Sequence, residues 1–412
     1  HPRSFPDGGP VPRLAAVREA LSADTDLAQV AAAAASREAR GQRILHLEGG
    51  EPDFATPAHV VEALIAAVRA GETRYPNPGG VLPLRVALAE KLALENGIAC
   101  HPEDVVVTAG ATHGLFLALR ALLGPGGELL LLEPHWPPVP GMLALLDGAR
   151  WRGVPAYLEV LEGRLEPGAL AERLRGSVRP ETRVLYLNTP NNPTGAVLSR
   201  EHLEAVAGVA RERDLWVVSD EAYEHILFDG AEHVSIASLP GMASRTVSLF
   251  SFSKSYAMTG WRLGCVVSPP ALRPVLGPAL GALTTRGVFP AVQFAGLAAM
   301  RGPQQAVETM RRAYQERRDL LFAQLEGQHA LRATRPAGAF YVFADVSAAL
   351  ERLTVWDLVR RWLELGIAVL PGTAFGPYPE RVRLSLAVRR EDIAEAMRRL
   401  REHYAGARSP AG

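Results

Sequence analysis

Lysine and cysteine are both almost absent from this chain. Of its 412 residues only Lys91 and Lys254 are lysine, although lysine and arginine together number 44. Since arginine supplies nearly all the positive charge, a lysine is not needed as a solvated cation, whereas its amine can lose a proton and act as a nucleophile. The only cysteines, Cys100 and Cys265, exclude a disulfide framework and a cysteine-based zinc site. We therefore expect a reducing, cytoplasmic location and no metal site.

Net charge and long apolar runs are absent as well. The formal net charge is zero, which gives no general attraction toward nucleic acids or anionic membranes, so we expect neither as a partner. No uninterrupted apolar run reaches the roughly 18 residues that a membrane span needs. The length of 412 residues exceeds the roughly 250 to 300 at which a single core stops growing, and it predicts two domains.

Short apolar runs alternate with helical patterns from residue 105 onward. Continuous rather than alternating hydrophobicity indicates strands buried on both faces, so we predict an α/β fold with a mostly parallel central sheet flanked by helices. After about residue 295, arginine-rich helices flank short strands, which predicts a smaller α+β domain. The predicted strands of the large sheet are 105–108, 129–132, 184–187, 216–219, 247–250 and 263–267.

The predicted division has three parts. Residues 51–294 form the large domain and residues 295–412 the small C-terminal domain. The N-terminal segment, residues 1–50, contributes to the small domain and covers the active site. Its first ten residues are rich in turn formers, and we expect them to be mobile or to lie on a partner.

Lys254 lies between small hydroxyl residues, in the run Ser-Phe-Ser-Lys-Ser-Tyr-Ala-Met-Thr-Gly-Trp-Arg at residues 251–262. This setting favours a lysine kept for its chemistry over a surface lysine in a loop. Lys91 lies in a helical pattern at residues 88–94, and we interpret it as a residue of the polar face.

Three further loops follow predicted strands, where ligands bind in open α/β sheets. Residues 108–114 are small and precede a helix, which favours an anion such as phosphate at the helix N-terminus, although caps and turns use the same residues. Residues 188–195, Asn-Thr-Pro-Asn-Asn-Pro-Thr-Gly, present asparagines on a backbone restrained by two prolines; the alternative is a simple turn. Residues 219–223 place Asp220 at the end of a strand and Tyr223 shortly after it, and either could be structural.

Together these motifs resemble the aspartate aminotransferase superfamily, the fold type I enzymes of aminotransferase class I/II that use pyridoxal 5'-phosphate (PLP). The resemblance starts at Gly-Gly-Glu-Pro-Asp-Phe (49–54), continues through Tyr-Pro-Asn-Pro-Gly-Gly (75–80) and reaches Arg383. It implies that the large domain binds PLP and that the protein is a homodimer with shared active sites.

The resemblance also implies catalytic roles. Lys254 would form the Schiff base with PLP and then move the proton between the substrate Cα and the cofactor. Asp220 would pair with the protonated ring nitrogen, which keeps the ring an electron sink. Tyr223 and Asn192 would donate hydrogen bonds to the ring oxygen, and Asn188 would shape the loop.

Further residues are implied to bind the phosphate and the ring. Trp136 would stack on the ring, and Tyr75 would reach the phosphate in the neighbouring subunit. The beginning of the helix after residue 108 and the lysine segment would surround the phosphate through Gly110, Ala111, Thr112, Ser251, Ser253 and Arg262.

Substrate recognition is implied less completely. Arg383 would grip the α-carboxylate, and although Arg381 shares its face of the strand, the following Leu-Ser favours Arg383. Gly50 and Asn192 would contact the same substrate. Arg286 falls near an arginine that binds the distal carboxylate of acidic substrates from the partner subunit, but a structural role is the alternative. Phe54, Phe340 and Tyr341 could line the pocket.

The function that follows is transfer of an α-amino group from an amino acid to a 2-oxo acid, by a ping-pong reaction through pyridoxamine phosphate. An alternative with the same cofactor is a β- or γ-lyase, a cyclase or an oxidase, because PLP alone does not decide the fate of the Cα carbanion. A non-catalytic effector domain of a transcription regulator is disfavoured, because the residues before Gly49 show no helix-turn-helix pattern.

Overall fold

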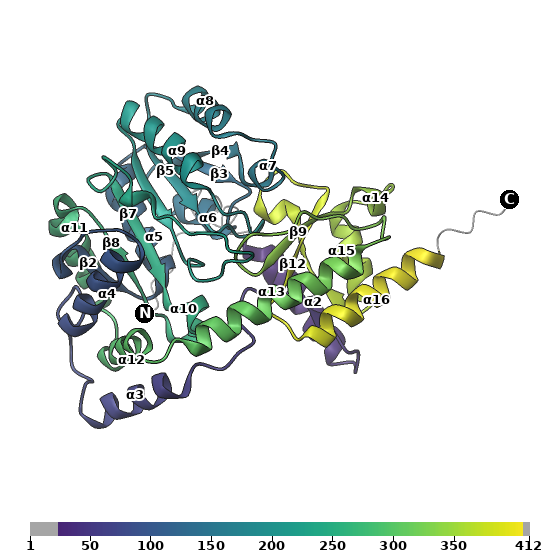
Figure 1. Cartoon of the computed structure of the whole chain (residues 1–412), viewed down its shortest axis with the longest axis horizontal. Helices are drawn as coiled ribbons and strands as arrows, with labels where there is room; N and C mark the ends of the chain where they lie inside the picture. The colour runs from purple at the N-terminus through teal and green to yellow at the C-terminus, as the bar shows by residue number, and fades with distance from the viewer. Residues whose placement is uncertain (1–23, 407–412) are drawn as a thin grey trace, which may run out of the picture.

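The structure is a computed structural model in which residues 24–406 are described. The first residues of the chain, for which a mobile or partner-bound segment is expected, lie outside this range. Two bodies are visible in Figure 1: a large one around a seven-stranded sheet, and a smaller one at the side of the C-terminal helices. The fold prediction is confirmed: a mostly parallel sheet between helices, with a second, smaller sheet domain.

The large sheet has the strand order β2-β8-β7-β6-β5-β3-β4. All neighbouring pairs are parallel except those of β8, which runs antiparallel to both β7 and β2. The strands are β2 (Val105–Thr108), β3 (Glu128–Glu133), β4 (Arg150–Pro155), β5 (Thr182–Asn188), β6 (Trp216–Asp220), β7 (Thr246–Ser251) and β8 (Gly264–Val267).

Alternate side chains of these strands enter two different hydrophobic clusters. On β3, Leu130 and Leu132 join one cluster and Leu129 and Leu131 join the other, and all four are buried. Burial on both faces explains why the strands appear in the sequence as continuous apolar runs. The edge strand β4 was not predicted, because its sequence Arg-Trp-Arg-Gly-Val-Pro is largely accessible and forms no such run.

Helices cover both faces of the large sheet. One cluster lies under α8 and α9, and the other under α5, α6 and α11. The helices of this body are α3 (Ala58–Arg69), α4 (Leu82–Glu95), α5 (Gly110–Leu123), α6 (Pro138–Ala144), α7 (Tyr157–Leu161), α8 (Pro167–Ser177), α9 (Arg200–Glu212), α10 (Phe252–Ser255), α11 (Arg273–Thr284) and α12 (Pro290–Arg301).

The smaller body contains two short sheets, β11-β12-β9 and β1-β10. Residues before Gly49 belong to its hydrophobic cluster, since Leu45 and Leu47 share that cluster with Phe340 and Trp362. Its elements are α2 (Asp24–Glu38), β1 (Leu45–His46), α13 (Gln305–Leu325), β9 (Tyr341–Asp345), α14 (Ser347–Leu350), α15 (Val355–Glu364), β10 (Ile367–Ala368), β11 (Leu370–Pro371), β12 (Arg381–Ser385) and α16 (Arg390–Gly406). The boundaries at residues 51 and 295 stay a prediction.

Strand direction decides where the chemical groups meet. The carboxyl ends of β5, β6 and β7 share one edge of the sheet because these strands are parallel. The antiparallel strand β8 begins at the same edge, so the residues just before it arrive there too. No helix within residues 24–406 is long and apolar enough to cross a membrane.

Candidate active site

A cavity of about 560 Å³ lies at this edge of the large sheet. Residues of the small sheets close it from the opposite side, among them Tyr341, Leu370 and Arg383. The cavity therefore lies between the two bodies and is lined by both. Its lining includes most of the sequence-predicted site residues, namely Gly50, Ala111, Thr112, Trp136, Asn192, Asp220, Tyr223, Ser251, Ser253, Lys254, Arg262 and Arg383.

Lys254 lies on the short helix α10, directly after β7. Its Nζ donates a short hydrogen bond to the carbonyl oxygen of Gly50. Burial, together with the nearby Arg383 guanidinium, lowers the pKa of the amine to about 8. A substantial fraction of the side chain is therefore a neutral amine near physiological pH, which a nucleophile or a base requires.

Asp220 ends β6 and is buried. Tyr186 of β5 donates from its hydroxyl to Oδ2 at 2.9 Å, and the backbone N–H of Ala222 donates to Oδ1 at 3.1 Å. No ion pair to Asp220 is formed within residues 24–406, and burial raises its pKa to about 6. Among the described residues, the two hydrogen-bond donors to this carboxylate are neutral, so it can accept a cation from a ligand.

The role of Tyr186 was missed in the sequence, where it stands inside an apolar run. A phenol in a strand buried on both faces needs a hydrogen-bond partner, and that requirement is the signal that could have found it. Its hydroxyl now connects β5 to the end of β6.

Tyr223 and Asn192 face the cavity from two different loops. The hydroxyl of Tyr223 lies 3.0 Å from the hydroxyl of Tyr341. The backbone N–H of Asn192 donates to Oδ1 of Asn188 at 2.8 Å, and the Nδ2 of Asn188 donates to the carbonyl of Asp220. Asn188 thus shapes the loop, as expected, although it also lines the cavity.

The N-terminus of α5 and the end of the lysine segment form an anion-binding corner. Gly110 has a φ of +78°, and a Cβ there would lie 2.5 Å from Nη2 of Arg262. The guanidinium is itself held by a hydrogen bond from Nη1 to the carbonyl of Thr259 at 2.8 Å. The first amides of a helix have no intrahelical partner. Those of α5 and the guanidinium together favour a doubly charged anion.

Arg383 is buried on β12, with its guanidinium against the rings of Tyr341 and Phe375 at 4.3 and 5.0 Å. Nη2 donates to the carbonyl of Glu48 at 2.5 Å, and Nε has no partner among the described residues. Arg381 instead points to Glu162 at 3.5 Å and does not line the cavity. Of the two arginines, only Arg383 can meet a ligand there.

Three predicted residues do not line the cavity of their own chain: Gly110, which lies beside it at the N-terminus of α5, and two that lie away from it. Tyr75 is 72% exposed, and Arg286 is exposed in the loop after α11. Their segments are neighbours, because a Cβ on Gly287 would lie 3.4 Å from the carbonyl of Pro78. The positions leave both side chains available to a second subunit.

Of the three aromatic residues considered for the pocket, one lines the cavity and two do not. Tyr341 lines the cavity, whereas Phe54 and Phe340 pack against Tyr314 behind it. His135 is buried, its Nδ1 lies 3.3 Å from the carbonyl of Trp136, and burial lowers its pKa to about 4. Lining residues that were not predicted are Leu27, Glu51, Pro137, Pro138, Ala222, Thr259, Gly260, Leu370 and Ala374.

The interpretation of Lys91 as a residue of the polar face is wrong. Its side chain is only 14% exposed, and its Nζ lies 2.5 Å from a carboxylate oxygen of Glu224. A helical pattern cannot distinguish a solvated lysine from one whose helix face meets a buried carboxylate of another segment.

Comparison with known proteins agrees with this geometry. The sequence pattern of the family "Aminotransferase class I and II" matches residues 42–400. The chain is 40% identical to the aspartate/prephenate aminotransferase of Thermus thermophilus over 372 residues, which is 87% of this chain and 91% of that protein. It is 41% identical to an arginine–pyruvate transaminase of Pseudomonas aeruginosa over 371 residues, 89% of this chain and 91% of the relative.

Solved structures show the same relationship. The aspartate aminotransferase from Thermus thermophilus with maleate superposes with a TM-score of 0.86 at 37% identity, covering 96% of this chain and 99% of that one. The aromatic aminotransferase from Pyrococcus horikoshii gives 0.83 at 36% identity, covering 91% and 99%. The chain belongs to the class I and II aminotransferase family, and it is an aminotransferase.

Proposed function

We propose that this aminotransferase holds PLP covalently through Lys254 and moves amino groups from an amino acid to a 2-oxo acid in two half-reactions. The observation that carries the proposal is Asp220, a buried carboxylate with a raised pKa and no cationic partner in the described chain. A protonated ring nitrogen would supply that cation. The anion-binding corner beside Arg262 fits a phosphate, and the cavity of about 560 Å³ suits a ligand of this size.

When bound, the cofactor supplies an aldehyde that takes up the amino group and a ring that accepts the electron pair of Cα. The chain's own residues do the rest. Lys254, whose amine has a pKa of about 8, accepts the proton from the substrate Cα and then donates it to the cofactor carbon that receives the amino group. Tyr223 and Asn192 orient the ring oxygen by hydrogen bonds, and Trp136 covers the ring.

Arg383 grips the α-carboxylate shared by amino acid and oxo acid. Its Nη1 donates to Oδ1 of Asn192 at 3.0 Å, which holds the guanidinium in place. Gly50 stands beside it without a side chain, and a Cβ there would lie 2.9 Å from the hydroxyl of Tyr341. The close approach of this segment helps to exclude water from the reacting atoms.

The class of the substrate side chain depends on a second subunit. Among the described residues, the cations that line the cavity are Lys254, Arg262 and Arg383, and each has a role in the proposal. A distal carboxylate therefore needs a cation from elsewhere, which we assign to Arg286 of a partner chain. The relatives include enzymes named for aspartate and for arginine, so both donor classes belong in the test.

We propose a homodimer in which Tyr75 completes the phosphate site of the other subunit. The segments around Tyr75 and Arg286 also expose large apolar side chains, which a partner would cover: Leu82 at 51%, Leu283 at 62% and Phe289 at 45%. A cytoplasmic location stays a prediction.

Half-reaction spectroscopy tests the proposal. PLP-loaded protein should lose its visible band when an amino acid alone is added, because the amino group is transferred to the cofactor. A 2-oxo acid should then restore the band. Release of ammonia or an altered carbon skeleton without conversion of the cofactor would instead indicate a lyase or an oxidase. Lys254→Ala should lack the initial band, and a band retained in that variant would contradict the assignment of Lys254.

A further inference from the structure

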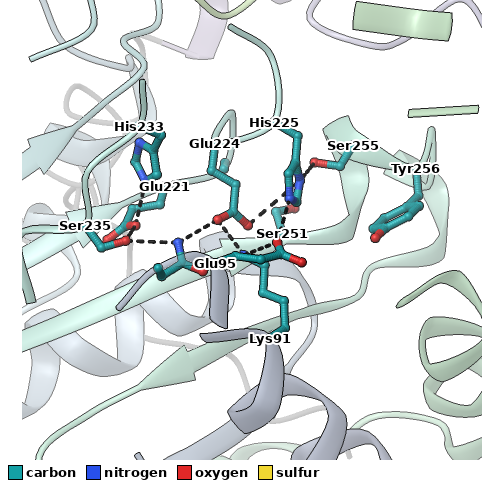
Figure 2. A network of polar contacts seen from close by, with 12 residues as sticks. Lys91, Glu95, Glu221, Glu224, His225, His233, Ser235, Ser251, Ser255 and Tyr256 are labelled. Atoms are coloured by element: carbon teal, nitrogen blue, oxygen red, sulfur yellow. Dashed lines mark hydrogen bonds and ion pairs between the residues drawn. The ribbon is translucent and has the colours of Figure 1, made fainter. Parts of the chain in front are cut away.

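Lys91, the second of the two lysines, lies in a buried network behind the cavity. It lies on α4, just before the last turn of that helix. Its Nζ donates to Glu224 at 2.5 Å and to Oδ1 of Asn96 at 2.8 Å, and lies 4.8 Å from the ring centre of Phe250. The ion pair is largely buried, with 14% and 10% of the two side chains exposed. Figure 2 shows Lys91 reaching the network from below.

One branch of the network fixes the turn that follows β6. Glu224 also accepts from Nδ2 of Asn96 at 2.8 Å, and Asn96 donates onward to Ser235 at 2.9 Å. Ser235 and His233 both contact the carboxylate of Glu221, His233 at 2.8 Å. Glu221 directly follows Asp220 in the chain, and Glu224 directly follows Tyr223. The network therefore fixes the turn after β6 at two positions, one beside each proposed catalytic residue.

A second branch reaches the helix that carries Lys254. His225 Nδ1 lies 2.9 Å from the hydroxyl of Ser255, the residue after Lys254. The other ring nitrogen lies 3.4 Å from Glu95, which in turn is 3.8 Å from Nζ of Lys91. Both branches therefore meet at the end of α4 (Figure 2).

The cation of this cluster is Lys91 itself. The ligand atoms of Glu221, Glu224 and His233 lie within 4.8 Å of one another, a spacing that a metal ion could use. The Lys91 ammonium already contacts Glu224, and its attraction lowers the pKa of that carboxyl to about 2 against the effect of burial. A metal ion would have to compete with this bonded ammonium, so the polar atoms serve the architecture of the turn.

We propose that Lys91 is a positioning residue for catalysis: its network sets the placement of Lys254 relative to Asp220 and Tyr223. The inference rests on the proposed role of Lys254 and extends it to a residue that touches neither cofactor nor substrate. The physical reason is that buried polar groups with satisfied hydrogen bonds hold one geometry. The groups around Lys91 and Glu224 are bonded in this way, whereas Oε1 of Glu221 and Nδ1 of His233 at the far end of the network have no partner among the described residues. Displacements of about 1 Å at a reacting centre can reduce a rate by roughly 100-fold.

The two-lysine composition provides a direct readout. Protein grown with lysine labelled with ¹³C at Cε contains just two labelled residues, and Lys91→Met leaves the signal of Lys254 alone. The charged groups that act most strongly on the Lys254 amine are Arg383, Glu51, Arg262 and Asp220. A displaced titration of Lys254 in Lys91→Met, measured without cofactor, therefore reports altered geometry at the cavity.

We expect Lys91→Met to displace that titration and to lower kcat by roughly 10- to 100-fold with a smaller change in KM. Lys91→Met/Glu224→Gln removes the unpaired buried charge, so it should recover thermal stability while the titration and kcat stay altered. The matched control is Glu90→Gln on the same helix, whose exposed partner is Arg301 at 2.6 Å; it should change neither quantity.

The outcomes separate this inference from the proposed function. If the parent protein binds PLP at Lys254 and Lys91→Met keeps the parent's titration and kcat, Lys91 is not a positioning residue. Full recovery of both quantities in the double variant would likewise reduce its role to charge neutralisation and overturn the inference. If the parent forms no bond between PLP and Lys254, the proposed function itself fails.

Discussion

Nη1 of Arg383 donates to Oδ1 of Asn192 at 3.0 Å and thereby joins the small sheet to the loop after β5. The two residues are 191 positions apart in the chain. The bond connects the group proposed to hold the substrate carboxylate with the group proposed to orient the cofactor ring, so that both ligands would be placed by one contact.

Replacing Arg383 should weaken recognition of every substrate. Arg383→Ala removes charge-assisted hydrogen bonds worth about 1.5 to 3 kcal/mol, so kcat/KM should fall roughly 10- to 100-fold or more for amino acids and oxo acids alike. Steady-state kinetics with both substrate types measures this. Arg381→Ala is the control, since that residue lies on the same strand and outside the cavity. Equal losses in both variants would contradict the assignment.

Gly110→Ala should reduce cofactor affinity. A methyl group at this position would lie 2.5 Å from the Arg262 guanidinium, so the arginine must move away from the anion-binding corner. We expect PLP to bind about tenfold more weakly, corresponding to roughly 1.4 kcal/mol, as measured by titration of the apoprotein.

Gly163→Ala is the matched control for Gly110→Ala. Gly163 also has a positive φ, +66°, but no atom of the described residues lies within 4 Å of its added Cβ. Both variants carry backbone strain of about 1 to 2 kcal/mol, yet only Gly110→Ala should change affinity. A tenfold loss in Gly163→Ala would show that strain alone accounts for the effect.

The pH dependence of the free energy of unfolding should reflect the titration of the Asp220 carboxyl group. Its folded pKa of about 6 lies above the ordinary value of 3.8, so the folded apoprotein binds this proton more tightly than the unfolded chain. The resulting stabilisation is complete below pH 4 and is lost as the pH rises through 6. Asp220→Asn avoids this loss, and the cofactor-free variant should be more stable than the parent at pH 7.5 by up to about 3 kcal/mol. Urea unfolding at pH 4 and 7.5 checks the sign.

PLP should reverse the order of stability of the parent protein and Asp220→Asn. A ring cation beside Asp220 favours the carboxylate form and offsets the free-energy cost of burying its charge. At pH 7.5 the cofactor should therefore stabilise the parent more than it stabilises Asp220→Asn. A variant stabilised as strongly as the parent would argue against a pairing between Asp220 and the ring.

Tyr186→Phe should act through Asp220 alone. The tyrosine hydroxyl lowers the pKa of this carboxyl, so its removal should raise that pKa further and leave less carboxylate near neutrality. We expect PLP affinity to fall about threefold to tenfold at pH 6 to 7 and to recover at pH 8 to 9, since one neutral hydrogen bond contributes about 1 kcal/mol. A loss that does not depend on pH would point to packing.

Complementation should reveal whether Tyr75 acts between subunits. Tyr75→Ala and Lys254→Ala should each be impaired alone. In a mixed dimer, the Tyr75→Ala chain keeps its Lys254 and the Lys254→Ala chain keeps its Tyr75. One site combines these two native residues and is intact, whereas the other site carries both substitutions. Activity should therefore appear when the two variants are unfolded together and refolded as a mixture. Activity no higher than that of Tyr75→Ala alone would mean that the sites are not shared.

The sequence alone contained the family, the fold class and most of the cavity's lining. Residues such as Asp220 and Lys254 directly follow apolar strands, and parallel strands deliver their carboxyl ends to one edge, so local pattern and topology lead to the same place. Buried strands are also readable because both of their faces are apolar, as on β3.

Only the tertiary structure decided which polar side chains meet. Arg262 reaches the cavity because β8 runs antiparallel to its neighbours, and Tyr186 acquires its role from the adjacent strand. Lys91 looked like a solvated residue until the turn after β6 placed Glu224 beside it. Helical periodicity in the sequence shows which face of a helix a residue lies on. Whether a charge on that face is buried depends on its partner, and the partner of Lys91 is more than a hundred residues away in the chain. Only folding brings the two side chains together.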